Sequence, residues 1–187
     1  MKRKCLLFFL LAAAGMALAL QAAEFSFEKA KRVDDFLNRI ARLERQTLFL
    51  HKMTFSQDEF NSYLNLIYVK RYAPEVTFID LELQEKNRVK GRLHVKLDAP
   101  QYDNIPSFLR DVDVRVNGRV ECENNRTRYV FEELWVNGAS FSPEVLDEVY
   151  GLAQVGAKVK SSIYDWFSLL PGLKKFTTGP KSITLYY

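Results

Sequence analysis

The feature that most constrains the fold is a change from helical to two-residue periodicity after Pro74. In residues 88–98, apolar side chains at odd positions alternate with charged or polar side chains at even positions. Successive side chains of a β-strand point to opposite faces of its sheet, so this pattern indicates one packed face and one solvated face. The same alternation occupies residues 77–84, before a polar turn at 85–87. Together these segments predict an antiparallel hairpin.

A second hairpin is predicted by the same pattern further along the chain. The valines between residues 112 and 120 share one face with Cys122, and a polar turn at 123–125 leads into a strand at 127–136. Within this last strand, the apolar phase shifts across Glu132-Glu133. A shift of one residue turns every later side chain to the opposite face, so we predict a β-bulge there.

Two amphipathic helices are expected before the strands. The first spans residues 27–50, with an apolar stripe at helical spacing: Val33, Phe36, Ile40 and Leu43. The second begins at Ser56, which forms a capping box with Glu59, while Phe55 and Phe60 provide a hydrophobic staple. Its predicted buried stripe is Phe60, Tyr63, Leu64 and Ile67.

A third and longer helix is expected from Pro143 to about Phe167. Ser142 is a favoured N-cap residue, and proline is favoured at the first helical position. Such a helix would be ~37 Å long, about the length of the longest predicted strand. Its predicted stripe is Val145, Val149, Leu152, Gly156, Val159, Ile163 and then Trp166 or Phe167.

With a closing hairpin at residues 173–187, the element order is α-α-β-β-β-β-α-β-β. This order predicts an α+β fold in which a long, curved antiparallel sheet of about six strands wraps against the long helix of the C-terminal half. The two N-terminal helices would close an end or an edge of the sheet. We expect a single domain at 24–187, with an N-terminal helix at 24–50 and a helix-plus-sheet module at 54–187.

Residues 1–23 have the three parts of a secretory signal peptide. Lys2, Arg3 and Lys4 form a positive region, residues 5–20 are apolar, and Ala22-Ala23 offers the small residues that signal peptidase requires. We therefore expect cleavage after Ala23, export to the periplasm or cell envelope, and no stable membrane span afterwards. The apolar run approaches the length of a membrane span, so a retained N-terminal anchor is the alternative.

Removal of this leader changes the charge balance of the chain. The chain has 27 Lys and Arg residues against 23 Asp and Glu, and the leader contains three of the bases and no acid. The remaining domain would have 24 bases against 23 acids, which gives no support for nucleic-acid binding. Cys122 would then be the last cysteine, so an intramolecular disulfide is not expected.

No catalytic or cofactor-binding constellation is found in the sequence. The two histidines, His51 and His94, lack further ligands at metal-binding spacing. Neither a nucleophile-elbow serine nor a glycine-rich phosphate loop is present. The acidic pairs on the strands, such as Asp80 with Glu82, fit the solvated face of a sheet. We therefore predict a protein that is not an enzyme and uses no cofactor or metal.

Small residues gather in the middle of the third predicted helix, at Ala153, Gly156 and Ala157. Two interpretations remain open. Small side chains allow a helix to approach a sheet closely in a packed core. They can also leave an apolar groove between helix and sheet that suits an acyl chain or another hydrophobic ligand.

Three segments resemble bacterial envelope proteins of the LmeA and YpmS kind. Residues 55–64, Phe-Ser-Gln-Asp-Glu-Phe-Asn-Ser-Tyr-Leu, resemble the short entry helix of those families, and residues 136–143 and 170–185 are similar in layout. The resemblance implies a half-barrel related to the tubular lipid-binding (TULIP-like) fold, with lipid binding by some members. The helix at 27–50 and the aromatic-rich tail depart from that pattern. With the stripes, the resemblance implies an interior lined by Tyr63, Leu64, Ile67, Leu152, Gly156, Val159 and Ile163.

Two functions of different kinds follow from these expectations. The first is an exported carrier that binds a lipid or another hydrophobic ligand between helix and sheet, without catalysis. The alternative is an envelope interaction or scaffold module with a fully packed core, no ligand and a protein partner in the envelope.

Overall fold

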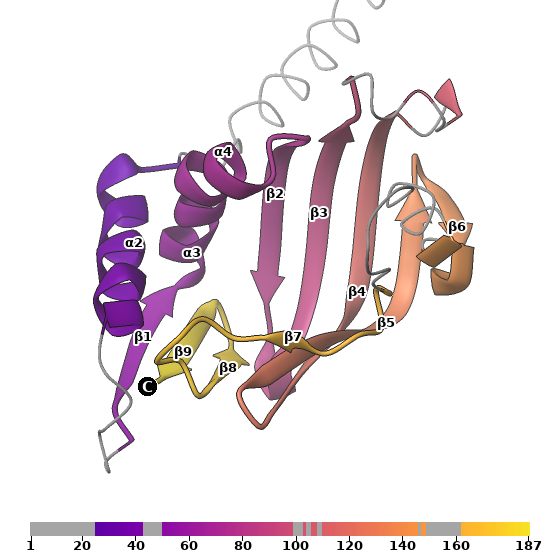
Figure 1. Ribbon diagram of the computed structural model, residues 1–187. Coiled ribbons are helices and arrows are strands. Elements are labelled where there is room, and N and C mark those ends of the chain that lie inside the picture. The colour runs from indigo at the N-terminus through magenta and orange to yellow at the C-terminus, as the bar shows by residue number, and fades with distance from the viewer. Residues whose placement is uncertain are drawn as a thin grey trace, which may run out of the picture.

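The structure is a computed structural model of the chain (Figure 1). It describes residues 25–42, 50–98, 103, 106–107, 110–145, 147–148 and 162–187. The larger of its two sheets has six antiparallel strands. Five of them follow in the order β2 (Val76–Leu83), β3 (Arg88–Lys96), β4 (Asp111–Glu123), β5 (Arg126–Val136) and β6 (Ala139–Phe141), and the sixth, β7 (Phe167–Ser168), pairs with β5 next to its start. The smaller sheet has the order β1 (Lys52–Ser56), β9 (Ser182–Tyr186) and β8 (Lys175–Gly179).

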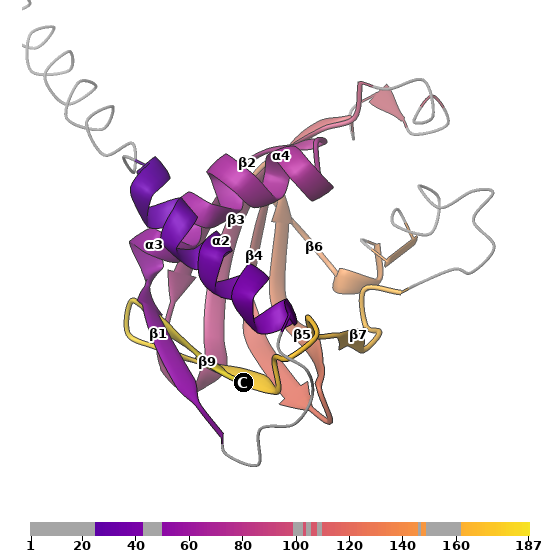
Figure 2. The ribbon, with the colours of Figure 1, turned by 60° about the vertical axis from the view of Figure 1, so that its left-hand side comes forward.

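The helices of the N-terminal half lie at one end of the larger sheet, beside β2 (Figures 1 and 2). They are α2 (Phe27–Arg42), α3 (Gln57–Tyr63), the π-helical turn η1 (Leu64–Tyr68) and α4 (Val69–Tyr72), while η2 (Glu85–Asn87) is a short 3-10 turn between β2 and β3. An α+β fold with a mainly antiparallel sheet of about six strands is therefore confirmed. In the described parts of the chain, no helix is long and apolar enough to cross a membrane.

Helix α2 has the buried stripe that its sequence predicts. Val33, Phe36 and Ile40 are buried, and they form the main core together with residues of α3, β9 and the β2–β3 hairpin. The predicted C-terminal end of this helix is wrong, because Leu50 lies outside any helix. Leu43 lies outside the described residues.

The start of α3 confirms the predicted capping box. The Ser56 hydroxyl accepts a hydrogen bond from the Glu59 backbone N–H at 3.2 Å, and the Glu59 carboxylate accepts one from the Ser56 N–H at 2.8 Å. Burial raises the pKa of Glu59, but hydrogen bonds from Ser56 and Arg32 outweigh that effect, so its pKa is lowered overall. Phe55, immediately before the cap, is completely buried.

The predicted buried stripe of the second helix needs correction. Tyr63 is buried, but Phe60, Leu64 and Ile67 are only partly buried. All three still pack against the main core, and the polar residues Asn61 and Ser62 are buried as well. The physical reason is that α3 presents amide side chains to the edge of the sheet, as well as an apolar stripe to the core.

Three amides, Gln57, Asn61 and Asn65, form what we call the amide ladder along the free edge of β2. The Asn61 side chain accepts a hydrogen bond from Leu81 N–H and donates one to the Leu81 carbonyl, each at 3.0 Å. Asn65 binds Ile79 in the same way, at 2.9 and 2.5 Å. Gln57 accepts a bond from Leu83 N–H at 2.7 Å. The ladder thus satisfies the backbone groups that an edge strand leaves unpaired.

The amide ladder depends on a match between two periodicities. Its amides are four residues apart on the helix, a rise of about 6 Å. Their partners are two residues apart on β2, about 6.6 Å along a strand. One face of a helix can therefore follow one edge of a strand for about two turns, as a substitute for a neighbouring strand.

The predicted β-bulge lies in β5. Gly118 of β4 pairs with Phe131, whereas Asn117 pairs with Glu133, so Glu132 is the extra residue. Glu132 forms an ion pair with Arg88 of β3. A side chain at position 118 would bring its Cβ within 2.2 Å of the Val130 carbonyl oxygen, which explains the glycine opposite the bulge.

The closing hairpin is confirmed as β8 and β9, and it joins the two sheets. The Lys181 N–H in its turn donates to the Leu83 carbonyl at 3.0 Å. The Thr178 hydroxyl donates to the Gln84 carbonyl at 2.8 Å, and its N–H donates to the Asn87 side chain at 2.9 Å. The smaller sheet is thereby attached to the tip of the β2–β3 hairpin.

The prediction of one straight helix from Pro143 to Phe167 is wrong. The described residues from Pro143 to Glu148 are helical, but Ile163 lies in a turn and Phe167 lies in β7. The Asp147 carboxylate accepts hydrogen bonds from the Ser162 hydroxyl at 2.8 Å and from the Ile163 N–H at 2.9 Å. In a straight helix, residues 147 and 163 would be about 24 Å apart. Asp147 and Ile163 therefore cannot belong to one straight helix.

Replacement of Asn61 by leucine tests the amide ladder. Leucine has a similar volume but cannot bond to either backbone group of Leu81, so the free energy of unfolding should fall by about 1–3 kcal/mol. Urea denaturation measures this value. Asn38→Ala is the control, because Asn38 is exposed on α2, and it should change stability by less than about 0.5 kcal/mol. Equal stability of the two variants would contradict the role of the ladder.

Candidate ligand-binding face of the sheet

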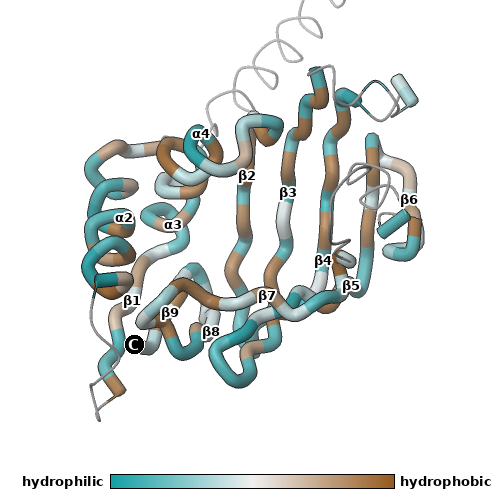
Figure 3. Tube along the Cα trace, in the orientation of Figure 1, coloured by the Kyte–Doolittle hydropathy of each residue, from teal (hydrophilic) through white to brown (hydrophobic). Residues whose placement is uncertain are grey.

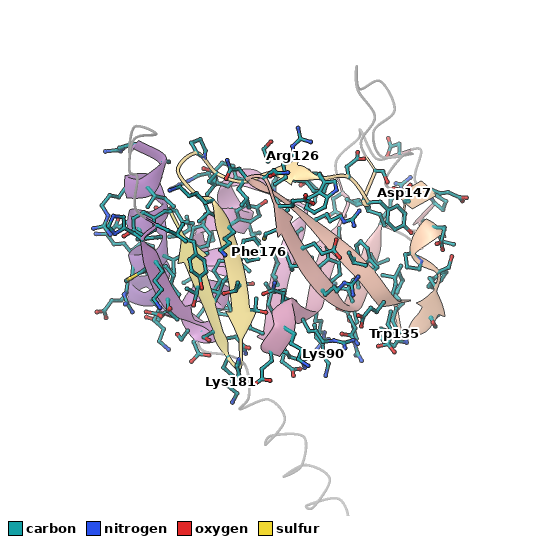
Figure 4. The ribbon with its side chains drawn as sticks, turned by 90° about the horizontal axis from the view of Figure 1, so that it is seen from below. Lys90, Arg126, Trp135, Asp147, Phe176 and Lys181 are labelled. Carbon is teal, nitrogen blue, oxygen red and sulfur yellow. The ribbon has the colours of Figure 1, made fainter. Side chains whose placement is uncertain are left out.

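The two faces of the larger sheet differ sharply in character. One face, here called the apolar face, carries the odd-numbered residues of β3 and the even-numbered residues of β4, which lie opposite each other in register. Figure 3 shows the alternation of hydrophobic and hydrophilic residues along these strands. The other face, here called the polar face, carries Lys90 and Trp135, which lie along the same side of the sheet in Figure 4.

The half of the apolar face at the end of the strands that carries the β2–β3 and β4–β5 turns belongs to the main core. Leu83 and Val89 are buried there, and Leu81, Val120 and Tyr129 pack against the same core. Helices α3 and α4 and the turn η1 contact the sheet through β2. The inner half of the face is therefore ordinary protein interior.

The remaining half of the apolar face lies outside the main core. We call it the outer half; its partly exposed members are Leu93, Val95, Val114, Val116, Phe131 and Val136. Val112 and Leu134 are buried in the same region. These residues occupy neighbouring positions on β3, β4 and β5, because Val114 lies opposite both Leu93 and Val136. The outer half is thus a continuous apolar surface across three strands.

Gly91 lies at the boundary between the two halves. A Cβ at this position would be 2.9 Å from a methyl group of Val116 and 3.3 Å from one of Leu81. These two side chains therefore approach each other over the glycine and fill the sheet face at this point. Space for a ligand must accordingly lie further out, towards Val114 and Val136.

Tyr129 supplies a neutral polar group at the end of the apolar face near β7. Its hydroxyl donates a hydrogen bond to the Val89 carbonyl at 2.7 Å, and its ring packs edge-on against Phe131 at 4.7 Å. Burial and the nearby Glu132 carboxylate raise the pKa of the Tyr129 phenol. The ring therefore adds no charge to the apolar face at neutral pH.

Three of the predicted ligand-binding residues lie in the inner core. Tyr63 is buried, and Leu64 packs against the same cluster. Ile67 packs there too, and it also lines an open cleft of about 550 Å³ between α2 and η1, beside Lys31 and Lys70. The structure therefore places these residues in the core around α3, and not on the outer half.

The other predicted ligand-binding residues fall into two groups. Leu152, Gly156 and Val159 lie outside the described residues. Ile163 is described and partly buried, but it lies in the turn bound by Asp147, so it does not continue a helical stripe. Among the four described members of the predicted lining, Ile163 is thus separate from the three residues around α3, and the lining as a whole stays a prediction.

The outer half was already visible in the sequence as strand alternation. The valines of β4 were recognised as a packed face, but ligand contact was assigned to helices because a helix was expected to cover the sheet. Cys122, predicted to be buried, is only partly buried at the end of that face, with its Sγ 3.7 Å from the Thr127 hydroxyl. The missing information was how far the described helices extend over the sheet.

Neither a scan against protein-family models nor a search of the curated proteins gives a match. Among the described residues, no group of three or more His, Cys, Asp or Glu side chains could hold a metal ion. Any functional assignment therefore depends on the sheet and its side chains.

The buried phenol of Tyr63 predicts a pH dependence of stability. Burial, together with nearby Asp34, raises its pKa from about 10 to about 12. The folded state holds this proton more tightly than the unfolded chain does, so the stabilisation is complete below pH 10 and is lost as the pH rises to 12. In Tyr63→Phe, the free energy of unfolding should fall less steeply than in the wild type over that range.

Urea denaturation at several pH values between 9 and about 12 measures this slope. Tyr186→Phe, which alters a partly exposed ring on β9, should keep the wild-type slope. A Tyr63→Phe slope equal to that of the wild type would show that the buried phenol is not linked to folding.

Proposed function

We propose that the protein is an exported, non-catalytic carrier that binds a lipid or another apolar ligand on the outer half of the apolar face. The observation that carries this proposal is a continuous set of partly exposed Leu, Val and Phe side chains on β3, β4 and β5, outside the main core. Exposed apolar patches of this kind commonly mark binding sites.

The energetics of the face support a ligand. Apolar surface left in water costs about 25 cal/mol per Å², so several exposed aliphatic side chains together give a ligand a substantial gain on binding. The bound ligand would be apolar, because the six partly exposed members of the outer half carry no polar side-chain atom.

The extent of the outer half sets the size of the ligand contact. On β4 it runs from Val112 to Val116, which at about 3.3 Å per residue is about 13 Å, and it continues across β3 and β5. This is enough surface to contact part of an acyl chain. The leader sequence supports export to the periplasm or cell envelope, and the resemblance to the LmeA and YpmS kind supports a lipid as the ligand.

Native mass spectrometry of protein purified from the cells that make it tests the proposal directly. Organic extraction followed by lipid analysis should recover an apolar ligand in stoichiometric amount. Protein that carries no ligand and also fails to bind an added fatty acid, such as cis-parinaric acid, would overturn the proposal.

Val114→Glu tests where the ligand binds. It places a carboxylate at the centre of the outer half, and an unpaired charge is costly to bury under an apolar ligand. The affinity for cis-parinaric acid, measured by its fluorescence, should fall at least about tenfold, which corresponds to about 1.4 kcal/mol.

Val130→Glu is the matched control, because Val130 lies on β5 with its side chain on the polar face, opposite Arg119. It should bind the probe as the wild type does. Circular dichroism establishes that both variants are folded. Equal binding by folded Val114→Glu and Val130→Glu would exclude the outer half as the site.

A further inference from the structure

A second candidate site lies on the polar face, where an open cleft of about 400 Å³ crosses strands β2 to β5. We call it the polar-face cleft. Two cross-strand rows line it. The first row is Asp80, Arg92, Arg115 and Trp135, and the second is Glu82, Lys90, Asn117 and Glu133.

The first unusual feature of the polar-face cleft is a pair of arginines directly opposite each other. Arg92 of β3 pairs in register with Arg115 of β4. Like charges in such positions destabilise a sheet. Arg92 has a carboxylate partner, Asp113, at 3.5 Å, whereas exposed Arg115 has no hydrogen bond or ion pair with the described residues. An anionic group bound between the two guanidinium groups would relieve this repulsion.

The second unusual feature is the side chain of Asn117. Its Nδ2 donates a hydrogen bond to the Glu133 carboxylate at 2.9 Å. Its Oδ1 is buried and accepts no hydrogen bond from any described residue. Among the described residues, no other buried side-chain oxygen or nitrogen lacks a hydrogen-bond partner. A buried acceptor without a partner costs about 1–3 kcal/mol. A ligand that displaces the surrounding side chains and brings a donor would satisfy it.

Trp135 provides an aromatic surface beside Arg115, its direct cross-strand neighbour. The ring is partly exposed and lines the same cleft. An indole face can stack on the C–H groups of a flat ring while neighbouring polar groups bond to its edge.

The charge balance of the lining narrows the class of ligand. Three cations line the polar-face cleft, Lys90, Arg92 and Arg115, and so do three carboxylates, Asp80, Glu82 and Glu133. A nucleic acid or an anionic membrane, which needs clustered positive charge, gains little from such a lining. A ligand with many hydroxyl groups can donate to the carboxylates and accept from the cations at the same time.

We propose that the polar-face cleft binds an acidic saccharide. The carboxylate of the sugar lies between Arg115 and Arg92, and its ring stacks on Trp135. A hydroxyl group donates to Asn117 Oδ1. This site is separate from the proposed lipid site, because the two lie on opposite faces of the same strands.

Fluorescence of Trp135 provides the test. The chain contains two tryptophans, and Trp166→Phe leaves Trp135 as the single reporter. Tetragalacturonate is the acidic probe, and galactotetraose is its neutral counterpart. We expect saturable binding of tetragalacturonate and at least tenfold weaker binding of the neutral sugar.

Arg115→Ala, made in the single-tryptophan protein, should weaken tetragalacturonate binding at least tenfold. Because it removes the repulsion with Arg92, it should also leave the melting temperature of the free protein unchanged or slightly higher. Asn117→Ala should weaken binding several-fold. Arg119→Ala is the matched control, since Arg119 lies on the same strand and face, outside the cleft, and pairs with Glu121. It should bind like the parent protein.

Three results would overturn the proposal. They are the absence of saturable binding, equal affinity for the neutral sugar, and unchanged affinity in Arg115→Ala. Displacement of tetragalacturonate by an equal concentration of inorganic phosphate would likewise show a simple anion site instead of a saccharide site. None of these results bears on cis-parinaric acid binding, so the two proposals stand or fall separately.

Discussion

The pairing of the amide ladder with β2 is the interaction on which the rest of the structure depends. A sheet edge buried against a helix leaves its N–H and C=O groups without partners unless the helix supplies them, and helix backbones cannot do so. Gln57, Asn61 and Asn65 supply these partners through their side chains. Their bonds fix α3 along β2, and the core of α2 and the smaller sheet then forms around α3. The ladder also blocks one edge of the sheet against pairing with another chain.

Along its strands the apolar face is divided: the main core covers the end that carries the β2–β3 and β4–β5 turns, and the described part of the chain leaves the outer half partly exposed. Across the sheet, apolar and polar side chains are kept on opposite faces. The bulge at Glu132 keeps this division intact on β5, because it resets the side-chain phase so that Leu134 and Val136 stay on the same face as Tyr129. If Glu132 were paired in a regular strand without the bulge, those side chains would turn to the polar face, and Trp135 would turn to the apolar one.

Local patterns predicted the strands, the bulge and the capping box, because each depends on residues close in sequence. The amide ladder was missed although its four-residue spacing is visible in the sequence, because helical spacing alone does not show what a polar face contacts. Only the position of β2 beside α3 reveals their role. The error at the third helix has a similar cause. The regular apolar stripe through Ile163 fits helical periodicity, but the hydrogen bond from the Ile163 N–H to the Asp147 carboxylate joins two residues that a straight helix would hold far apart. Periodicity does not predict such a contact. The ligand-binding prediction drew four of its seven residues from that stripe, and it stays a prediction.

The alternation of side chains has a final consequence for how the two proposed sites relate. Val114 and Arg115 are adjacent in β4, yet their side chains leave the sheet in opposite directions. Any coupling between ligands on the two faces must therefore pass through the backbone of the shared strands. The β4 backbone is hydrogen-bonded to β3 on one side and to β5 on the other, so it resists the shifts that would transmit a signal. The architecture thus favours independent occupation of the two faces, as in a protein that holds an apolar ligand on one side while it is tethered through the other.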